Sequence, residues 1–302
     1  MLTELPIASQ PAVDASDVIF STGDALIRVP VAGGEPVTIA QAQAPTAPIV
    51  LGTMAYFSAE MPVGSPDPNG KQQSAQRAFS VALAGGEPSS VPELDPFLLL
   101  AADGAALYLD TYGPDFKRWD PTSGELATLA HGAKISVDAI SIYGDYVYVA
   151  AQDIGVGGFT NGVIGRIRKL GGSLEILVSG LGHPWNLVAS QAGLYWSEDP
   201  PALYGAGPGR IAKSKLTGAA VTTISDTTAT SLAFSRGRLF AALGSEIDSF
   251  PADGGTPTVL ASGLSNAGML TIAGANLVWV DPVDQALSST DPTFAMTTCA
   301  AP

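Results

Sequence analysis

Residues 29–40 read VPVAGGEPVTIA, and residues 250–261 read FPADGGTPTVLA. Each stretch has a hydrophobic residue and a proline, two further residues, Gly-Gly, one more residue, a second proline, and a short β-type run that ends in alanine. Because Gly-Gly supplies the positive φ that a tight hairpin needs, the phrase predicts two strands joined by a turn. Its return far along the chain indicates an internal repeat.

A second run of the same unit is easier to follow, because its centre is hydrophobic or aromatic. It occurs seven times, as DVIFST, MAYFSA, ALYLDT, YVYVAA, GLYWSE, RLFAAL and LVWVDP. The central residues of these runs are Ile19, Tyr56, Tyr108, Tyr148, Tyr195, Phe240 and Trp279. Their average step of about 43 residues is typical of four-stranded propeller blades.

The repeats predict an all-β fold, a seven-bladed β-propeller of four-stranded antiparallel blades. A single four-stranded sheet cannot bury both faces, whereas a ring of such sheets can. The alternative is a six-bladed ring with extra terminal strands, since the first and last copies are the most degenerate. We expect one domain over 1–302, with residues 2–9 adding a closing outer strand to the last blade. The approximate blades are 10–43, 44–93, 94–132, 133–180, 181–226, 227–263 and 264–302.

Composition excludes several classes of protein. The formal charge of −14, with only 14 lysines and arginines, disfavours a nucleic-acid partner. No apolar run reaches the roughly 20 residues of a membrane helix. Cys299 is the single cysteine, so neither an intramolecular disulfide nor a cysteine zinc site is expected. The first residues show no signal peptide, and no phosphate-binding loop, GxSxG, HExxH or CxxC motif is present.

The units resemble secreted or lipoprotein-like bacterial propellers, and more distantly YWTD and TolB-like propellers. The matching segments are Val13–Asp14 with Val18–Thr22, Ala102–Gly104 with Leu107–Asp110, Leu194–Glu198, and Ile27–Ala40. This resemblance implies an exported bacterial protein, extracellular or periplasmic, from a lipoprotein precursor. It implies no particular activity, because the shared residues are turn formers and core.

Long insertions predict where a ligand binds. In a propeller, the links from fourth strand to next first strand and from second to third strand emerge on one face, here named the top face. The insertions Met61–Gln76, Gln152–Gly162 and Pro200–Pro208 are all second-to-third links, so all three are expected there. Long loops on a rigid scaffold commonly carry recognition, although loops also simply tolerate insertion.

Both histidines are expected on the top face. His131 and His183 each precede a predicted first strand, and an imidazole can serve as acid, base or metal ligand. With Glu198 they are our catalytic candidates; the competing interpretation is a hydrogen-bonding surface histidine. Trp185 and Asn186, within HPWN, place an aromatic ring and an amide at the channel mouth, where they either bind a ligand or pack between blades.

Acidic residues recur near strand ends and complete the predicted ligand-binding set. These residues are Asp110, Asp138, Asp153, Asp199 and Asp281. The candidate metal ligands are two of these residues and one more acidic residue, namely Asp110, Asp281 and Glu60. Ca²⁺ prefers several oxygen ligands, which carboxylates can supply. Aspartate at a strand end is also ordinary turn chemistry. We expect no required cofactor, with Ca²⁺ or another divalent cation as the candidate ion.

The sequence therefore predicts a monomeric binding propeller whose acidic top-face channel mouth takes a small-molecule, glycan, peptide or protein ligand. The alternative is a metal-assisted lyase or hydrolase at the same mouth, with a histidine as acid or base and a carboxylate-held cation polarising the substrate.

Overall fold

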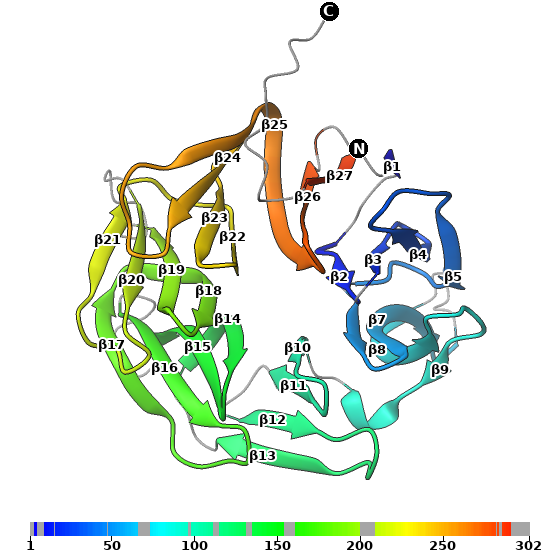
Figure 1. The fold of residues 1–302 in the computed structure, drawn as a ribbon. Coiled ribbons are helices and arrows are strands. Elements are labelled where there is room, and N and C mark those ends of the chain that lie inside the picture. Colours follow the sequence, from blue (N-terminus) through cyan, green and yellow to red (C-terminus); the bar gives the residue numbers. More distant parts are fainter. Residues whose placement is uncertain are drawn as a thin grey trace, which may run out of the picture.

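The computed structural model shows antiparallel sheets arranged radially in a ring around a central axis (Figure 1). The described residues are 3–4, 9–14, 16–46, 48–65, 73–95, 98–110, 115–130, 135–153, 161–199, 209–281, 283 and 286–290. Within them the only helical element is the short 3-10 turn η1 (Pro92–Leu94). No helix in this part of the chain is long and apolar enough to cross a membrane.

Five of the sheets have four strands each, in chain order from the channel to the rim. The first consists of β2 (Ala12–Val13), β3 (Asp17–Ser21), β4 (Ala25–Pro30) and β5 (Val37–Gln41). The second consists of β6 (Ile49–Leu51), β7 (Met54–Val63), β8 (Gln73–Ala82) and β9 (Ser89–Ser90). The third consists of β10 (Leu98–Ala102), β11 (Leu107–Asp110), β12 (Phe116–Trp119) and β13 (Leu126–Ala130). The fourth consists of β14 (Ile135–Tyr143), β15 (Tyr146–Asp153), β16 (Gly162–Arg168) and β17 (Glu175–Leu181). The fifth consists of β18 (His183–Ser190), β19 (Gly193–Asp199), β20 (Arg210–Ser214) and β21 (Thr222–Ser225).

The sixth sheet has seven strands, because one long strand belongs to two repeat copies. Its members are β22 (Ser231–Ser235), β23 (Arg238–Ala242), β24 (Gly244–Pro251), β25 (Thr258–Ala273), β26 (Asn276–Asp281), β27 (Ala286–Thr290) and β1 (Thr3–Glu4). The first part of β25 pairs with β24 and its last part with β26. The ring thus has six sheets, as in the six-bladed alternative, and the prediction of seven separate blades is wrong in that count.

The physical reason lies in the link between the sixth and seventh copies. The Asp281 carboxylate accepts hydrogen bonds from the backbone N–H groups of Ser265 and Asn266, which keeps this link extended. The corresponding link between β17 and β18 is interrupted at Gly182. At the other end of the sheet, β1 pairs with β27, so the N-terminal segment supplies the outermost strand beside the C-terminal copy.

Burial between neighbouring sheets holds the ring together. Ile19 and Leu26 of the first sheet pack against Phe57 of the second, and Tyr56 meets Trp119 of the third edge-on, with ring centroids 5.6 Å apart. Fully burying one such side chain stabilises a fold by about 1.5–3 kcal/mol. The seven central residues of the repeated second run are all at most 7% exposed, which confirms them as core.

The Gly-Gly phrase serves both its own hairpin and the contact with the preceding sheet. In the first copy, Gly33 adopts φ +87° and its N–H donates to the Pro30 carbonyl at 2.9 Å, closing the turn. In the second copy, the second glycine of the pair, Gly86, donates its N–H to Ile39 O of the first sheet at 3.1 Å. Gly172 makes the same contact with Leu129 O, also at 3.1 Å. The hairpin backbone therefore hydrogen-bonds directly to the outer strand of the preceding sheet.

Asp248 is a buried carboxylate in the third strand of its copy. It holds the ladder position in β24 that Ile27 holds in β4, directly after the same bulge. The side chain is 5% exposed, and Oδ1 has no hydrogen-bond partner among the described residues. Burial, with a smaller contribution from the Glu246 carboxylate, raises the pKa of Asp248 above its usual range.

Gly218→Ala tests the hairpin contact. Gly218 has φ +80°, and a Cβ there would lie 2.4 Å from the Leu177 carbonyl oxygen of the preceding sheet. Gly124→Ala is the matched control, because Gly124 has φ +71° but open space around its Cβ. Both variants lose about 1–2 kcal/mol to the left-handed backbone, so the control should lower Tm by a few degrees. Gly218→Ala should lower Tm by at least about twice as much; equal losses would contradict the proposed contact.

Asp248→Asn tests the buried carboxylate. Since the folded-state pKa is raised, ionisation of Asp248 costs stability above that pKa, and the cost disappears as the pH falls below it. The variant should therefore unfold a few degrees above the wild type at pH 7–8, with the gain shrinking toward pH 4. Thermal unfolding across this pH range measures it, with the exposed Asp226→Asn as control. A gain that is independent of pH would be inconsistent with this account.

Candidate functional site

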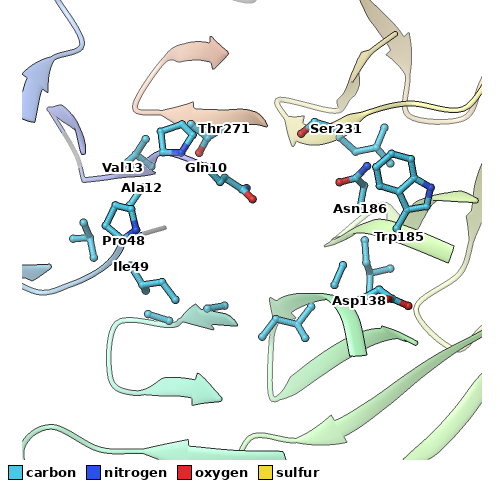
Figure 2. Close-up of a pocket in the computed structure, with 18 residues that line it drawn as sticks. Gln10, Ala12, Val13, Pro48, Ile49, Asp138, Trp185, Asn186, Ser231 and Thr271 are labelled. Atoms are coloured by element: carbon cyan, nitrogen blue, oxygen red, sulfur yellow. The ribbon is translucent and has the colours of Figure 1, made fainter. Parts of the chain in front are cut away.

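The inner strands surround a cavity of about 560 Å³ at the centre of the ring (Figure 2). Each of the seven repeat copies contributes to the wall, from β2, β6, β10, β14, β18, β22 and β25 or the residues just before them. Small and apolar side chains make up most of this wall. Its polar members are Gln10, Asp138, Asn186, Ser231 and Thr271, and Asp138 is the single ionisable side chain among the described lining residues.

The polar residues are not spread evenly around the cavity. Figure 2 shows Asp138, Trp185, Asn186 and Ser231 on one side and Val13, Pro48 and Ile49 on the other. The exposed Gln10 extends toward the middle of the space (Figure 2). The cavity thus has a polar wall, formed by β14, β18 and β22, that faces an apolar wall.

Irregularities in the inner strands orient the polar wall. Asp138 lies at a bulge in β14, between the paired residues Val137 and Ala139. Asn186 lies at a bulge in β18 and has φ +52°. A bulge adds one residue to one strand and redirects its side chain, and bulges are common beside functional sites. Both polar side chains of this wall therefore lie at irregular points of their inner strands.

Hydrogen bonds between adjacent inner strands fix this wall. Asn186 Nδ2 donates to the Ala229 carbonyl at 3.2 Å, which directs its Oδ1 toward the cavity (Figure 2). The Ser141 hydroxyl accepts from the N–H of Ala189 at 2.9 Å, and the Ser231 hydroxyl accepts from the N–H of Leu270 at 2.8 Å. Each bond joins two repeat copies, so the wall is held by the ring rather than by one sheet.

His183 lies between two carboxylates at the top-face end of β18. Its Nε2 is 3.4 Å from Asp138 Oδ2, and its Nδ1 is 3.9 Å from Asp199 Oδ2. The His183 and Asp199 side chains are about half exposed, at 50% and 48%, whereas Asp138 is 27% exposed. Burial raises the pKa of Asp138 above its usual range, and the nearby His183 opposes the rise. The structure therefore brings together three of the predicted residues.

Glu198 is not part of this group. It neighbours Asp199 in β19, and because successive side chains of a strand point to opposite faces, it lies on the other face. There Glu198 is 6% exposed, pairs with the Arg210 guanidinium and accepts a hydrogen bond from Trp196 Nε1 at 3.2 Å. These contacts describe a partly buried ion pair that joins β19 and β20.

Trp185 lines the cavity beside Asn186, but its indole is partly buried and Nε1 has no partner among the described residues. Gln152, which the sequence did not single out, is 2% exposed and donates from Nε2 to the Gly182 carbonyl at 3.4 Å. It therefore holds the backbone directly before His183. Gln10, Ser231 and Thr271 were also missed; their signal is a polar residue at or just before the first strand of a copy.

The candidate metal residues lie on three different strands, β7, β11 and β26. Glu60 accepts a hydrogen bond from the Ser74 hydroxyl at 3.2 Å. Asp281 is 3% exposed and accepts from three backbone N–H groups, which is turn chemistry. Asp110 ends β11. Among the described residues, no group of three or more histidine, cysteine, aspartate or glutamate side chains is placed to hold a metal ion.

Several predicted features lie outside the described residues. They are His131, the side chain of Asp153, residues 66–72 of the first insertion, residues 154–160 of the second, and the whole of the third. The described base of the first insertion is an extended hairpin, since Met61–Val63 continue to pair with Gln73–Ala75.

No protein-family model and no curated protein matches the sequence. Solved structures do match. YCF48 bound to D1 peptide has a TM-score of 0.64 at 12% identity, over 92% of both chains. The WD40 β-propeller domain of Doa1 has a TM-score of 0.63 at 11% identity, over 95% of this chain and 92% of that one. A TolB-type protein from Agrobacterium tumefaciens has a TM-score of 0.53 at 16% identity, over 72% and 84%. These matches show the β-propeller fold.

His183→Ala tests the pairing at the cavity. Because the imidazole opposes the burial-driven rise, its removal should raise the pKa of Asp138 further from the ordinary value of 3.8. A ¹³C NMR titration of the Asp138 carboxyl carbon measures the change directly. Glu93→Gln, an exposed change in η1, should leave that titration in place. An unchanged titration in His183→Ala would show that the two groups do not interact.

Proposed function

We propose that this protein is a binding propeller that recognises a peptide or protein segment at the top-face end of its central cavity. The observation that carries the proposal is the cavity itself. Its volume of about 560 Å³ lies within the range of about 300–1,000 Å³ that is usual for ligand pockets. It combines apolar surface with a few oriented polar groups, which is the composition expected of a recognition site.

The chemistry of the wall favours a peptide over a sugar. Sugar sites need an exposed aromatic face and many hydrogen-bonding groups, whereas Trp185 is partly buried and the Asn186 amide nitrogen already donates to Ala229. Apolar side chains of a peptide would suit the opposite wall. The D1 peptide bound by YCF48, a propeller of similar architecture, supports this ligand class at the level of the fold.

The alternative function, a metal-assisted lyase or hydrolase, depends on the same histidine. Its support is the 3.4 Å approach of His183 Nε2 to Asp138, since a carboxylate can orient a catalytic imidazole. However, each ring nitrogen of His183 faces a carboxylate. This arrangement suits charge pairing better than proton transfer with a substrate, so we favour binding.

The proposal includes an exported, monomeric protein. Its support is the resemblance of the repeat units to secreted and lipoprotein-like propellers and the strongly acidic composition, with 28 acidic and 14 basic residues. A high net charge of one sign favours solubility and disfavours self-association.

A random-peptide library selected on the wild-type protein tests the proposed function. Enriched peptides should lose at least about tenfold in affinity for Gln10→Trp, because Gln10 is exposed and extends into the cavity, so the indole would fill the space (Figure 2). Titration calorimetry of each peptide with both proteins measures the loss.

Gln41→Trp is the matched control, because Gln41 is an exposed residue at the end of the outer strand β5. Enriched peptides should bind this variant as they bind the wild type. Failure to enrich any peptide, or equal binding to Gln10→Trp and wild type, would reject the cavity as the peptide site. Parallel glycan and small-molecule panels identify the other ligand classes.

A further inference from the structure

The cavity has an unbalanced charge. Asp138 is the single ionisable side chain among its described lining residues, so no lysine or arginine is present in that lining. The basic group that contacts Asp138 is His183, whose Nε2 lies 3.4 Å from Oδ2 and whose side chain is half exposed at the mouth of the cavity. A partly buried carboxylate is stabilised by an opposite charge. A cationic group of a ligand would supply this opposite charge, whereas a neutral or anionic group would not.

Additional acceptors lie on the same wall. Asn186 directs its Oδ1 toward the cavity, because its Nδ2 is held by the Ala229 carbonyl (Figure 2). The Ser231 hydroxyl lies farther along this wall (Figure 2). An ammonium group has three N–H donors and accepts none, so a wall with a carboxylate and an amide oxygen matches it. At the mouth of the cavity, the half-exposed Asp199 adds negative potential.

The rest of the lining fits an aliphatic stem. Val13 and Ile49 lie across the cavity from Asp138 (Figure 2), and Val50, Ala101 and Ala102 add further apolar lining. A lysine side chain carries its charge on a flexible four-carbon stem, which can lie along such a surface while the head reaches a polar group. Arginine fits less well, because its guanidinium prefers two parallel contacts with a carboxylate. Here His183 already lies against Asp138 Oδ2.

We propose that the cavity receives a lysine side chain of a peptide segment, with its ammonium group paired with Asp138 and hydrogen-bonded to Asn186. The inference rests on the proposed function and specifies the chemistry of the ligand. Asp138 then acts as the residue that selects charge, and the apolar wall as the surface that selects an unbranched stem. His183 and Asp199 lie at the mouth of the cavity, where the lysine side chain enters.

The test uses capped pentapeptides Ala-Ala-X-Ala-Ala, in which X is lysine, arginine or norleucine. Norleucine keeps the aliphatic stem and lacks the charge. NMR shifts of the Asn186 side-chain amide and the Trp185 indole N–H report binding at the cavity. The lysine peptide should shift both signals and bind at least about tenfold more tightly than the norleucine peptide. Butylammonium, which has the charge and stem without a peptide backbone, should bind more weakly than the lysine peptide.

Asp138→Asn should abolish the preference for lysine over norleucine, while Glu93→Gln, an equal loss of charge in η1, should preserve it. Thermal unfolding of both variants establishes that they remain folded. Equal binding of the lysine and norleucine peptides, tighter binding of arginine, or a preference that survives in Asp138→Asn would overturn the proposal. Butylammonium that binds as tightly as the lysine peptide would identify a free amine as the occupant instead.

The two proposals fail differently. If library peptides depend on an open cavity but show no preference for lysine, the binding function stands and the lysine assignment is wrong. If no pentapeptide shifts the signals at up to about 10 mM, the lysine assignment is also wrong. The binding function fails only when the library yields no peptide sensitive to Gln10→Trp.

Discussion

Burial of one sheet face against the next is the constraint on which this structure depends. No four-stranded sheet here could stand alone, since its core residues, such as Phe57 and Tyr108, are shielded by a neighbouring sheet. The sheets must therefore close into a ring, and closure brings the first strand of every copy to the centre. Ring closure therefore creates the central cavity, and the side chains on the inner strands set its polarity and charge.

The repeated phrase of the sequence predicted much of this arrangement. Alternating strands, turn glycines and the aromatic position of each second run all have local physical causes, and the seven central residues are buried as expected. The number of separate sheets could not be read in the same way. It depends on whether the link before Ala267 stays extended, and the carboxylate of Asp281, which follows 15–16 residues later, holds that link by hydrogen bonds to its backbone.

The candidate site was predictable only in part. Asp138, His183, Asn186 and Asp199 were identified from their places near strand ends, and the structure gathers them. Glu198 was identified by the same reasoning, yet a shift of one residue from Asp199 places it on the opposite face of β19, paired with Arg210. The bulges that turn Asp138 and Asn186 to the cavity leave no clear mark in the sequence. Gln10 has only a weak signal, a polar residue just before a first strand, and it lines the cavity because ring closure brings that segment to the centre.

The unbroken course of β25 has a mechanical consequence. Figure 1 shows this strand running from the periphery of the ring to its centre, where Thr271 reaches the cavity. Because its backbone is hydrogen-bonded to β24 at one end and to β26 at the other, the strand acts as a stiff spoke. A force applied to the outer end of β25 would therefore be transmitted along this one strand to the central cavity. Between the fourth and fifth sheets, by contrast, Gly182 separates β17 from β18, so no single strand makes this connection.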